Sequence, residues 1–489
     1  MSGIDYLTLL LPEILLAAGG LAILILGLVW RGRQAYRPLS LLAILVSLGA
    51  LAATLATGNA RGALPQGMLA VDPFTGFFRV LGLACAALVL LLALGHDRLG
   101  HEFPGLLLFA VLGILLTAGA TNLVMIYVGI ELLSITSYVL AGLLREEPRS
   151  NEAAIKYFLY GAVAAAVMVY GFSLLLGLTG SLELGGIAEG LKAAAGPAAS
   201  LRWVAVPAIV LMMVGLGFKV AAVPFHQWSP DVYEGAPTPV TAFLSVGPKA
   251  AGFAVMARVF LMALPALQVE WAALLAALAA VTMTVGNLVA LWQTGMKRLL
   301  AYSSIAQAGY MLIGLASLQV SGDGSLVGNG LVALLIYLAA YLLTNLGAFA
   351  VVISLEDVTG TDAISSYTGL VHRAPLVATA LVFYFLSLVG IPPLACFLGK
   401  LLIFGAAIDA RLYWLAAVGV VNSVISLAYY FRVVRLMFFE PEAGKEAAVR
   451  LPGNVGLAVA VTWIGTVGLV ILGTPVIAWA SQSASLFVR

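Results

Sequence analysis

The stretch "GFKVAAVPFHQW", residues 217–228, places a lysine inside an otherwise apolar helical run. Lys219 lies five residues before Pro224 and seven before His226. A basic side chain near the centre of a bilayer costs about 2.5–3.5 kcal/mol on insertion scales. A helix that keeps such a residue is expected to use it, so this stretch indicates a membrane helix with a functional charge.

The composition of the whole chain supports a membrane protein. Apolar residues make up 62% of the 489 residues and charged residues only 9%, against about 25% charged in soluble domains. The net charge of +2 gives no sign of a nucleic-acid partner. Cys85 and Cys396 fit no metal or iron–sulfur spacing, and the four histidines include no pair four residues apart that could hold haem. The first apolar run, near Leu7, lacks a basic leader and is predicted to be a retained helix.

Runs of about 20 mostly apolar residues predict an all-α, polytopic membrane fold in a single transmembrane domain over 1–489. No linker is long enough for a soluble domain. About fourteen transmembrane helices are predicted at 7–30, 38–57, 73–95, 104–120, 122–144, 153–178, 203–228, 238–262, 270–292, 299–318, 328–354, 376–404, 412–437 and 455–480.

The basic residues outside these helices predict the orientation. Thirteen lie in one set of loops, and five lie in the opposite set together with the C-terminal tail. Cytoplasmic loops carry an excess of lysine and arginine. We therefore expect both termini outside the cytoplasm.

Six basic residues remain inside the predicted helices. Arg79 and Arg258 lie toward helix ends, where a long side chain can reach the membrane surface, so we expect them to do so. The other four are predicted to be buried functional charges, because each of their helices continues well past them: Lys156, Lys219, Lys249 and Lys400.

Glu131 is the acid that we expect deep in the membrane, in "IYVGIELLSITSYVLAG". Glu131 and one of the lysines could form a static ion pair that only holds two helices together. One carboxylate cannot neutralise four lysines, however, and excess buried positive charge favours a hydrated, protonatable path.

Prolines accompany three of the lysines. Because proline lacks an N–H, Pro224 and Pro248 leave the carbonyls of Val220 and Leu244 without helical partners beside Lys219 and Lys249. The pair 392–393 does the same two turns before Lys400, and a helix break is predicted at "GIPPLACFLGK". Broken helices beside ionisable residues are typical of ion-coupled transporters.

Lysine suits a switchable proton site, because it can lose its proton whereas arginine stays charged. Histidine relays protons near neutral pH. His226 is therefore a candidate relay, although a hydrogen bond at a helix end would explain it equally well.

The segment "GFKVAAVPFHQWSPDVYEGAPTPVTAFLSVGPKAAG" (217–252) closely resembles subunit N of bacterial respiratory complex I, the proton-pumping NADH–quinone oxidoreductase. The similarity continues through "YVGIELLSITSYVLAG", "EAAIKYFLYGA", "KRLLAYSSIAQAGY", "FYFLSLVGIPPLACFLGK" and "YYFRVVRLMFF", and covers about 5–480. Subunit N is one of the antiporter-like membrane subunits. Cys396 departs from the pattern, where glycine is expected, but leaves Lys400 in register.

The resemblance implies two inverted five-helix repeats with broken helices 7 and 12. Helices 1–3 would occupy 1–103, the first repeat (helices 4–8) 104–262, the second repeat (helices 9–13) 270–437, and helix 14 455–480. Site residues follow by matching motifs: Glu131 resembles the carboxylate paired with Lys219, Lys156 the modulating lysine, Lys249 the central lysine and Lys400 the terminal one.

The resemblance also implies that this chain moves protons and holds no cofactor. FMN, iron–sulfur clusters and quinone are expected in or between other subunits. The expected partners are the other complex I membrane subunits, including sister antiporter-like subunits, together with membrane lipids and protons, in a bacterial plasma membrane. A subunit of a multisubunit Na⁺/H⁺ antiporter is the alternative function; a solute carrier and a structural membrane adaptor rank below it.

Overall fold

The computed structural model describes residues 3–30, 32–58, 61–63, 67–194, 200–320, 326–440 and 451–487. Four residues that enter the charge count of the loops, Arg31, Lys445, Arg450 and Arg489, lie outside these ranges.

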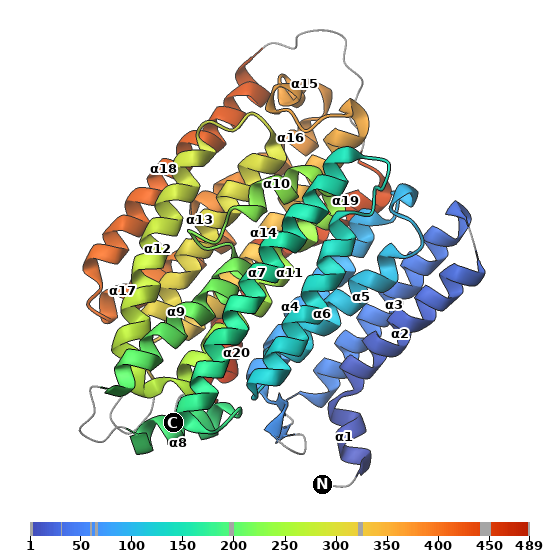
Figure 1. The fold of residues 1–489 in the computed structure, drawn as a ribbon. Coiled ribbons are helices and arrows are strands. Elements are labelled where there is room, and N and C mark those ends of the chain that lie inside the picture. The colour runs from blue at the N-terminus through green and yellow to red at the C-terminus, as the bar shows by residue number, and fades with distance from the viewer. Residues whose placement is uncertain are drawn as a thin grey trace.

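The prediction of an all-α fold is confirmed (Figure 1). Two short hairpins, β1 (Gly62–Ala63) with β2 (Ala70–Val71) and β3 (Gln319–Val320) with β4 (Leu326–Val327), join helices at their ends. Short 3₁₀ helices lie at Asp97–Leu99, Pro265–Leu267 and Ile364–Tyr367, and a π-helical turn lies at Val259–Ala263. The α-helices are α1 (Gly3–Leu9), α2 (Leu11–Val29), α3 (Arg33–Thr57), α4 (Pro73–Ala93), α5 (Phe103–Gly119), α6 (Leu123–Ala141), α7 (Pro148–Thr179), α8 (Leu184–Ala194), α9 (Ser200–Val220), α10 (Trp228–Gly235), α11 (Thr238–Arg258), α12 (Gln268–Ala290), α13 (Met296–Ala316), α14 (Gly330–Thr359), α15 (Leu370–Arg373), α16 (Pro375–Val389), α17 (Ala395–Asp409), α18 (Tyr413–Phe439), α19 (Gly453–Ile471) and α20 (Gly473–Ala484).

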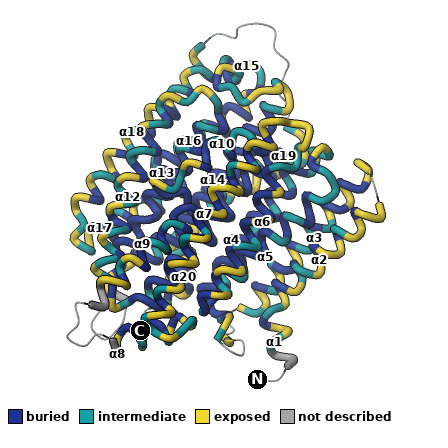
Figure 2. The backbone as a smooth tube through the Cα atoms, viewed as in Figure 1, coloured by how far each residue is buried: buried dark blue, intermediate teal, exposed yellow. Residues whose placement is uncertain are grey.

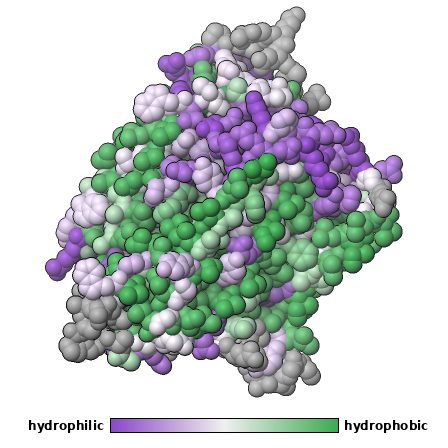
Figure 3. All heavy atoms as spheres, in the orientation of Figure 1, coloured by the Kyte–Doolittle hydropathy of each residue, from purple (hydrophilic) through white to green (hydrophobic). Residues whose placement is uncertain are grey.

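A broad hydrophobic surface covers the helices on the face of the molecule drawn in Figure 3, as a membrane protein requires. Hydrophilic residues gather toward one end of this face. Twelve of the described helices are long and apolar enough to cross a membrane, and α5 and α16 are shorter apolar helices. The protein is thus a multi-span membrane protein, while the count of fourteen spans and the inverted repeats remain predictions.

Three helices form the buried centre of the molecule. Every residue of α11 is buried, and α13 and α14 are buried over most of their length (Figure 2). By contrast, α2, α3 and α18 lie at the flanks and expose much of their apolar surface (Figure 2). Because Lys249 belongs to α11, it lies in the middle of the protein rather than against lipid.

Two helices are interrupted next to lysines. Helix α9 ends at Val220, directly after Lys219, and the chain resumes as a helix only at Trp228. Helix α16 ends at Val389 and α17 begins at Ala395, so the predicted break at "GIPPLACFLGK" is confirmed. Pro248, in contrast, lies within an unbroken α11.

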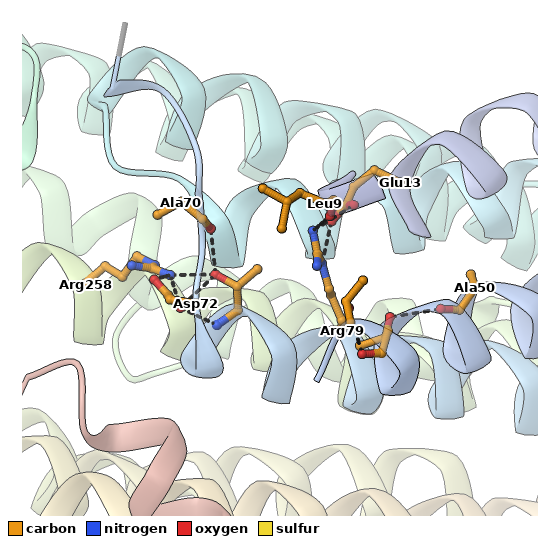
Figure 4. A network of polar contacts seen from close by, with 10 residues as sticks. Leu9, Glu13, Ala50, Ala70, Asp72, Arg79 and Arg258 are labelled. Carbon is orange, nitrogen blue, oxygen red and sulfur yellow. Dashed lines mark hydrogen bonds and ion pairs between the residues drawn. The ribbon is translucent and has the colours of Figure 1, made fainter. Parts of the chain in front are cut away.

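The expectation that Arg79 and Arg258 reach the membrane surface is wrong. Both side chains are buried, and Figure 4 shows each beside a carboxylate: Arg79 with Glu13 at 2.7 Å and Arg258 with Asp72 at 2.8 Å. Glu13 and Asp72 are also buried, so Glu131 is not the only acid in the interior. Buried charges need partners, and here helices distant in sequence supply them.

Candidate functional site: a chain of buried lysines

Lys219 occupies the last turn of α9 and is buried. Its Nζ donates a hydrogen bond of 2.5 Å to Ser134 Oγ on α6, and the Ser134 hydroxyl donates to the carbonyl of Ile130. Trp228 Nε1 donates to the carbonyl of Phe218 at 2.9 Å and so closes the end of α9 beside the lysine. The ammonium group therefore has a fixed neutral partner in the protein interior.

Glu131 lies one helical turn before Ser134 on α6 and is half-buried. Within the described residues, no hydrogen bond or ion pair joins its carboxylate directly to Lys219, although the two charges interact electrostatically. Ser134 takes the direct contact instead. The pairing of Glu131 with Lys219 therefore stays a prediction.

Lys156 differs from the prediction that it is buried. Its side chain is 37% exposed, and its Nζ pairs with Glu152 Oε1 on the same helix and with Asp231 Oδ2 on α10, both at 2.7 Å. Arg298 of α13 binds the other oxygen of Asp231 at 2.8 Å. The sequence-based comparison of four buried lysines with one buried acid left out the carboxylates of Glu152 and Asp231, because these residues lie near the ends of their helices.

Lys249 is buried in the centre of α11, as predicted. Its Nζ donates to both the carbonyl and the hydroxyl oxygen of Ser304 on α13, at 2.5 and 2.6 Å. Tyr341 of α14 donates to the same hydroxyl at 2.7 Å. The hydroxyl of Tyr233 lies 3.4 Å from Ser304 Oγ and donates at 3.3 Å to the carbonyl of Leu244, which Pro248 leaves free.

Lys219 and Lys249 lie on closely packed helices. A Cβ atom at Gly252 of α11 would come within 2.7 Å of Val220 Cγ1 and 3.2 Å of Lys219 Cβ. Gly252 is three residues, or one turn, from Lys249. A larger residue at 252 would force the two helices or these side chains to shift, so Gly252 favours the close approach of α9 and α11 one turn from Lys249.

Lys400 is buried on α17, just after the second interruption. Its Nζ donates at 2.9 Å to the carbonyl of Val389, which the proline at 393 leaves free, and at 3.2 Å to Ser423 Oγ of α18. The ammonium group also lies over the ring of Tyr310, 4.2 Å from its centroid, a favourable cation–π contact.

Polar residues on one face of α13 lie beside the central lysine and the terminal one. Ser304 binds Lys249, Gln307 donates to the carbonyl of Leu388 at 3.0 Å, and Tyr310 lies under Lys400. These positions are three residues apart, so they follow one face of the helix. Their role was not predicted from the sequence; the signal for it was the polar spacing in "SSIAQAGY", within an otherwise apolar helix.

His226 lies in the segment between α9 and α10 and is partly exposed. Its Nδ1 atom is buried and has no hydrogen-bond partner in the described part of the chain. The histidine is thus near the first lysine in sequence, and its role as a relay stays a prediction.

In the described residues, no group of three or more His, Cys, Asp or Glu side chains is placed to hold a metal ion. Cys85 and Cys396 are both buried and free, and Cys396 contacts the hydroxyl of Thr344 at 3.6 Å.

Residues 120–426 match the family described as "NADH:quinone oxidoreductase/Mrp antiporter, TM". The chain is 46% identical to NADH-quinone oxidoreductase subunit N 2 of Symbiobacterium thermophilum, over 88% of this chain and 86% of that protein. It is 43% identical to NADH-quinone oxidoreductase subunit N of an Anaeromyxobacter strain, over 97% and 96% of the two chains.

Solved structures show the same fold. A chain of respiratory complex I from Thermus thermophilus is similar with a TM-score of 0.79 and 35% identity, over 96% of this chain and 98% of that one. A chain of the Mrp complex from Dietzia has a TM-score of 0.85 at 20% identity, over 99% and 98% of the two chains, which shows a shared fold alone.

Proposed function

This chain belongs to the NADH:quinone oxidoreductase/Mrp antiporter family of membrane subunits, and we propose that it is the N-type, proton-translocating subunit of a bacterial NADH–quinone oxidoreductase. It is a membrane subunit of a multisubunit translocase. Protons move along Glu131, Lys219, Lys249 and Lys400, while redox chemistry takes place in other subunits.

One observation carries this assignment of residues. Three buried lysines follow one another through the interior, and each binds neutral oxygen atoms rather than a carboxylate: Ser134 for Lys219, Ser304 for Lys249, and Val389 with Ser423 for Lys400. A lysine held by neutral acceptors can lose its proton without leaving an unpaired carboxylate behind. Arginine in the same place would stay charged.

The geometry supports transfer by repulsion between neighbouring sites. Lys219 and Lys249 lie on helices in close contact at Gly252, in an interior where charges interact more strongly than in water. Protonation of one lysine therefore disfavours the charged state of the other. The hydroxyl groups of Ser304 and Tyr341 and the polar face of α13 then connect Lys249 toward Lys400.

The surroundings of the subunit follow from the same proposal. Its partners are the other membrane subunits of the complex, including sister antiporter-like subunits, and FMN, iron–sulfur clusters and quinone belong to other chains. Both termini lie outside the cytoplasm of a bacterial plasma membrane, as the charge of the loops indicates.

Lys219→Ala tests the proton path. Alanine has no group that can take up a proton, so the barrier to transfer past this position should rise by at least about 1.4 kcal/mol, and NADH-driven acidification of membrane vesicles should fall about tenfold or more per assembled complex. Lys219→Arg should fail equally although it keeps the charge. Lys192→Ala, at an exposed lysine of α8, is the matched control and should pump normally.

Normal pumping by an assembled Lys219→Ala complex would remove Lys219 from the path. NADH oxidation that does not co-purify with the chain would reject the assignment to the complex. Acidification that requires Na⁺ in the medium would instead favour a Na⁺/H⁺ antiporter subunit.

A further inference from the structure

A second hydrogen bond crosses the interruption between α16 and α17, beside the contact of Lys400 with Val389. Ser387 lies in the last turn of α16, and its Oγ accepts a hydrogen bond of 3.3 Å from the backbone N–H of Cys396, the second residue of α17. The first four N–H groups of a helix have no partner within that helix. Ser387 therefore supplies a partner for the start of α17 from the end of α16.

Thr344 of α14 binds Ser387 from a third helix. Thr344 Oγ1 and Ser387 Oγ form a hydrogen bond of 3.0 Å, and the Cys396 thiol contacts Thr344 Oγ1 at 3.6 Å. All three side chains are fully buried, and α14 packs against both α16 and α17. The two hydroxyl groups of Thr344 and Ser387, the hydroxyl pair, thus join the three helices at the interruption.

The hydroxyl pair differs from a hydroxyl group that bonds only within its own helix. Serine and threonine inside helices often donate to the carbonyl four residues earlier, as Ser354 does on α14 with the carbonyl of Ala350. Thr344 and Ser387 instead bind each other across the interface between α14 and α16. Their bond therefore depends on how these helices are placed, and in turn stabilises that placement.

The hydroxyl pair is close in sequence to both partners of the lysine contact. Ser387 is two residues before Val389, and Cys396 is four residues, about one helical turn, before Lys400. The two hydrogen bonds across the interruption therefore link the same short stretches of α16 and α17. Because residues 390–394 form no helix between them, contacts of this kind determine where α17 begins relative to Val389.

We propose that Thr344 and Ser387 are positioning residues for Lys400, because they fix the start of α17 against the end of α16. With α17 held there, the carbonyl of Val389 stays 2.9 Å from Lys400 Nζ. This carbonyl can bind the protonated and the neutral lysine, since both forms carry N–H groups. Without the hydroxyl pair, α17 can shift and the lysine loses a fixed acceptor. The inference rests on the proposed function, since it presupposes that Lys400 carries protons.

Thr344→Val tests the proposal in the complete complex, because valine has nearly the same shape and lacks only the hydroxyl group. The readout is NADH-driven acidification of membrane vesicles per assembled complex. We expect a fall of about two- to tenfold; tenfold corresponds to about 1.4 kcal/mol, a typical contribution of one neutral hydrogen bond. Thr344→Ser keeps the hydroxyl group and should retain most of the acidification.

A contact that only fastened α16 to the bundle would have a different signature. Tyr384 provides the comparison, because it lies one turn before Ser387 on α16 and its hydroxyl donates to the carbonyl of Val459 of α19 at 3.0 Å. Tyr384→Phe removes this contact without touching the interruption, so it should pump normally. Cys396→Ala keeps the N–H that binds Ser387 and loses only the thiol, so it should retain most of the acidification.

Ser387→Ala is the second variant in case Thr344→Val impairs assembly, because it removes the acceptor of the Cys396 N–H directly. Acidification should fall over the same range. Normal pumping by assembled Thr344→Val or Ser387→Ala complexes would overturn the positioning role, and so would an equal loss in Thr344→Ser or in Tyr384→Phe. Those results would leave Lys400 in the proton path, whereas normal pumping by assembled Lys400→Ala complexes would reject the proton site itself.

Discussion

Asp72→Ala should destabilise the protein strongly, because Asp72 performs two tasks at once. Its carboxylate accepts two hydrogen bonds from Arg258 Nη2, at 3.0 Å and 2.8 Å (Figure 4). It also caps α4 by accepting a hydrogen bond from the Thr75 backbone N–H at 2.8 Å. Arg258 is fully buried, so water cannot replace the lost counter-charge.

The magnitude follows from these two tasks. Removing one partner of a buried ion pair costs about 3–5 kcal/mol, because the remaining charge stays buried without a partner. Loss of the helix cap adds about 1 kcal/mol. Asp72→Ala should therefore lower the free energy of unfolding by about 4–6 kcal/mol. The double variant Asp72→Ala/Arg258→Met removes both charges, so it should lose only the cap, about 1 kcal/mol, and the Arg258 hydrogen bond to the carbonyl of Ala118, about 1–3 kcal/mol, which is less than the single variant loses.

The measurement is a detergent-unfolding titration of the purified chain, together with the amount of chain found in the assembled complex. Arg435→Ala is the matched control, since it removes an exposed ion pair with Glu440 and should change the free energy of unfolding by less than about 1 kcal/mol. A loss below about 1 kcal/mol for Asp72→Ala would refute the reasoning. Equal losses in the single and double variants would show that the ion pair itself contributes nothing.

Gly390→Ala should impair pumping, because Gly390 has a φ of +95° and an added Cβ would lie 2.9 Å from Lys400 Cδ. Acidification of vesicles per assembled complex should fall, and normal pumping would show that the turn can adjust. The excess of basic residues in one set of loops places the loop with Ser365 in the cytoplasm and the loop with Ala193 outside. A membrane-impermeant reagent should therefore label a cysteine at position 365 from the cytoplasmic side and a cysteine at position 193 from the outer side. Reversed labelling would overturn the orientation.

The sequence was sufficient for the features that depend on local pattern. Apolar runs predicted the helices, and the prolines at 392–393 predicted the break before Lys400, because both follow from the physics of a short segment. The burial of Lys249 was predictable for the same reason, since its helix extends well beyond it on both sides.

Features that depend on distant partners were not predictable. From the sequence, Arg79 and Arg258 were expected to reach the membrane surface. In the fold, Arg79 instead pairs with Glu13, 66 positions away, and Arg258 pairs with Asp72, 186 positions away. Lys156 looks buried until Asp231 is brought to it from 75 positions along the chain. A sequence gives the cost of a buried charge but not the partner that offsets it.

The proline positions show how that cost is met in the proton path. Three carbonyls that lose their helical partners to proline find another donor: Tyr233 donates to Leu244, Gln307 to Leu388 and Lys400 to Val389. An unpaired buried carbonyl would lower the stability of the fold by about 1–3 kcal/mol, and a buried ammonium group without acceptors would lower it by more. Placing the two next to each other removes both penalties at Lys400. The freed carbonyl is neutral, so it stabilises the protonated lysine without holding it as tightly as a carboxylate would. The helix interruption before Lys400 is therefore useful for chemistry as well as for shape, because it supplies an acceptor that can keep a proton or let it go.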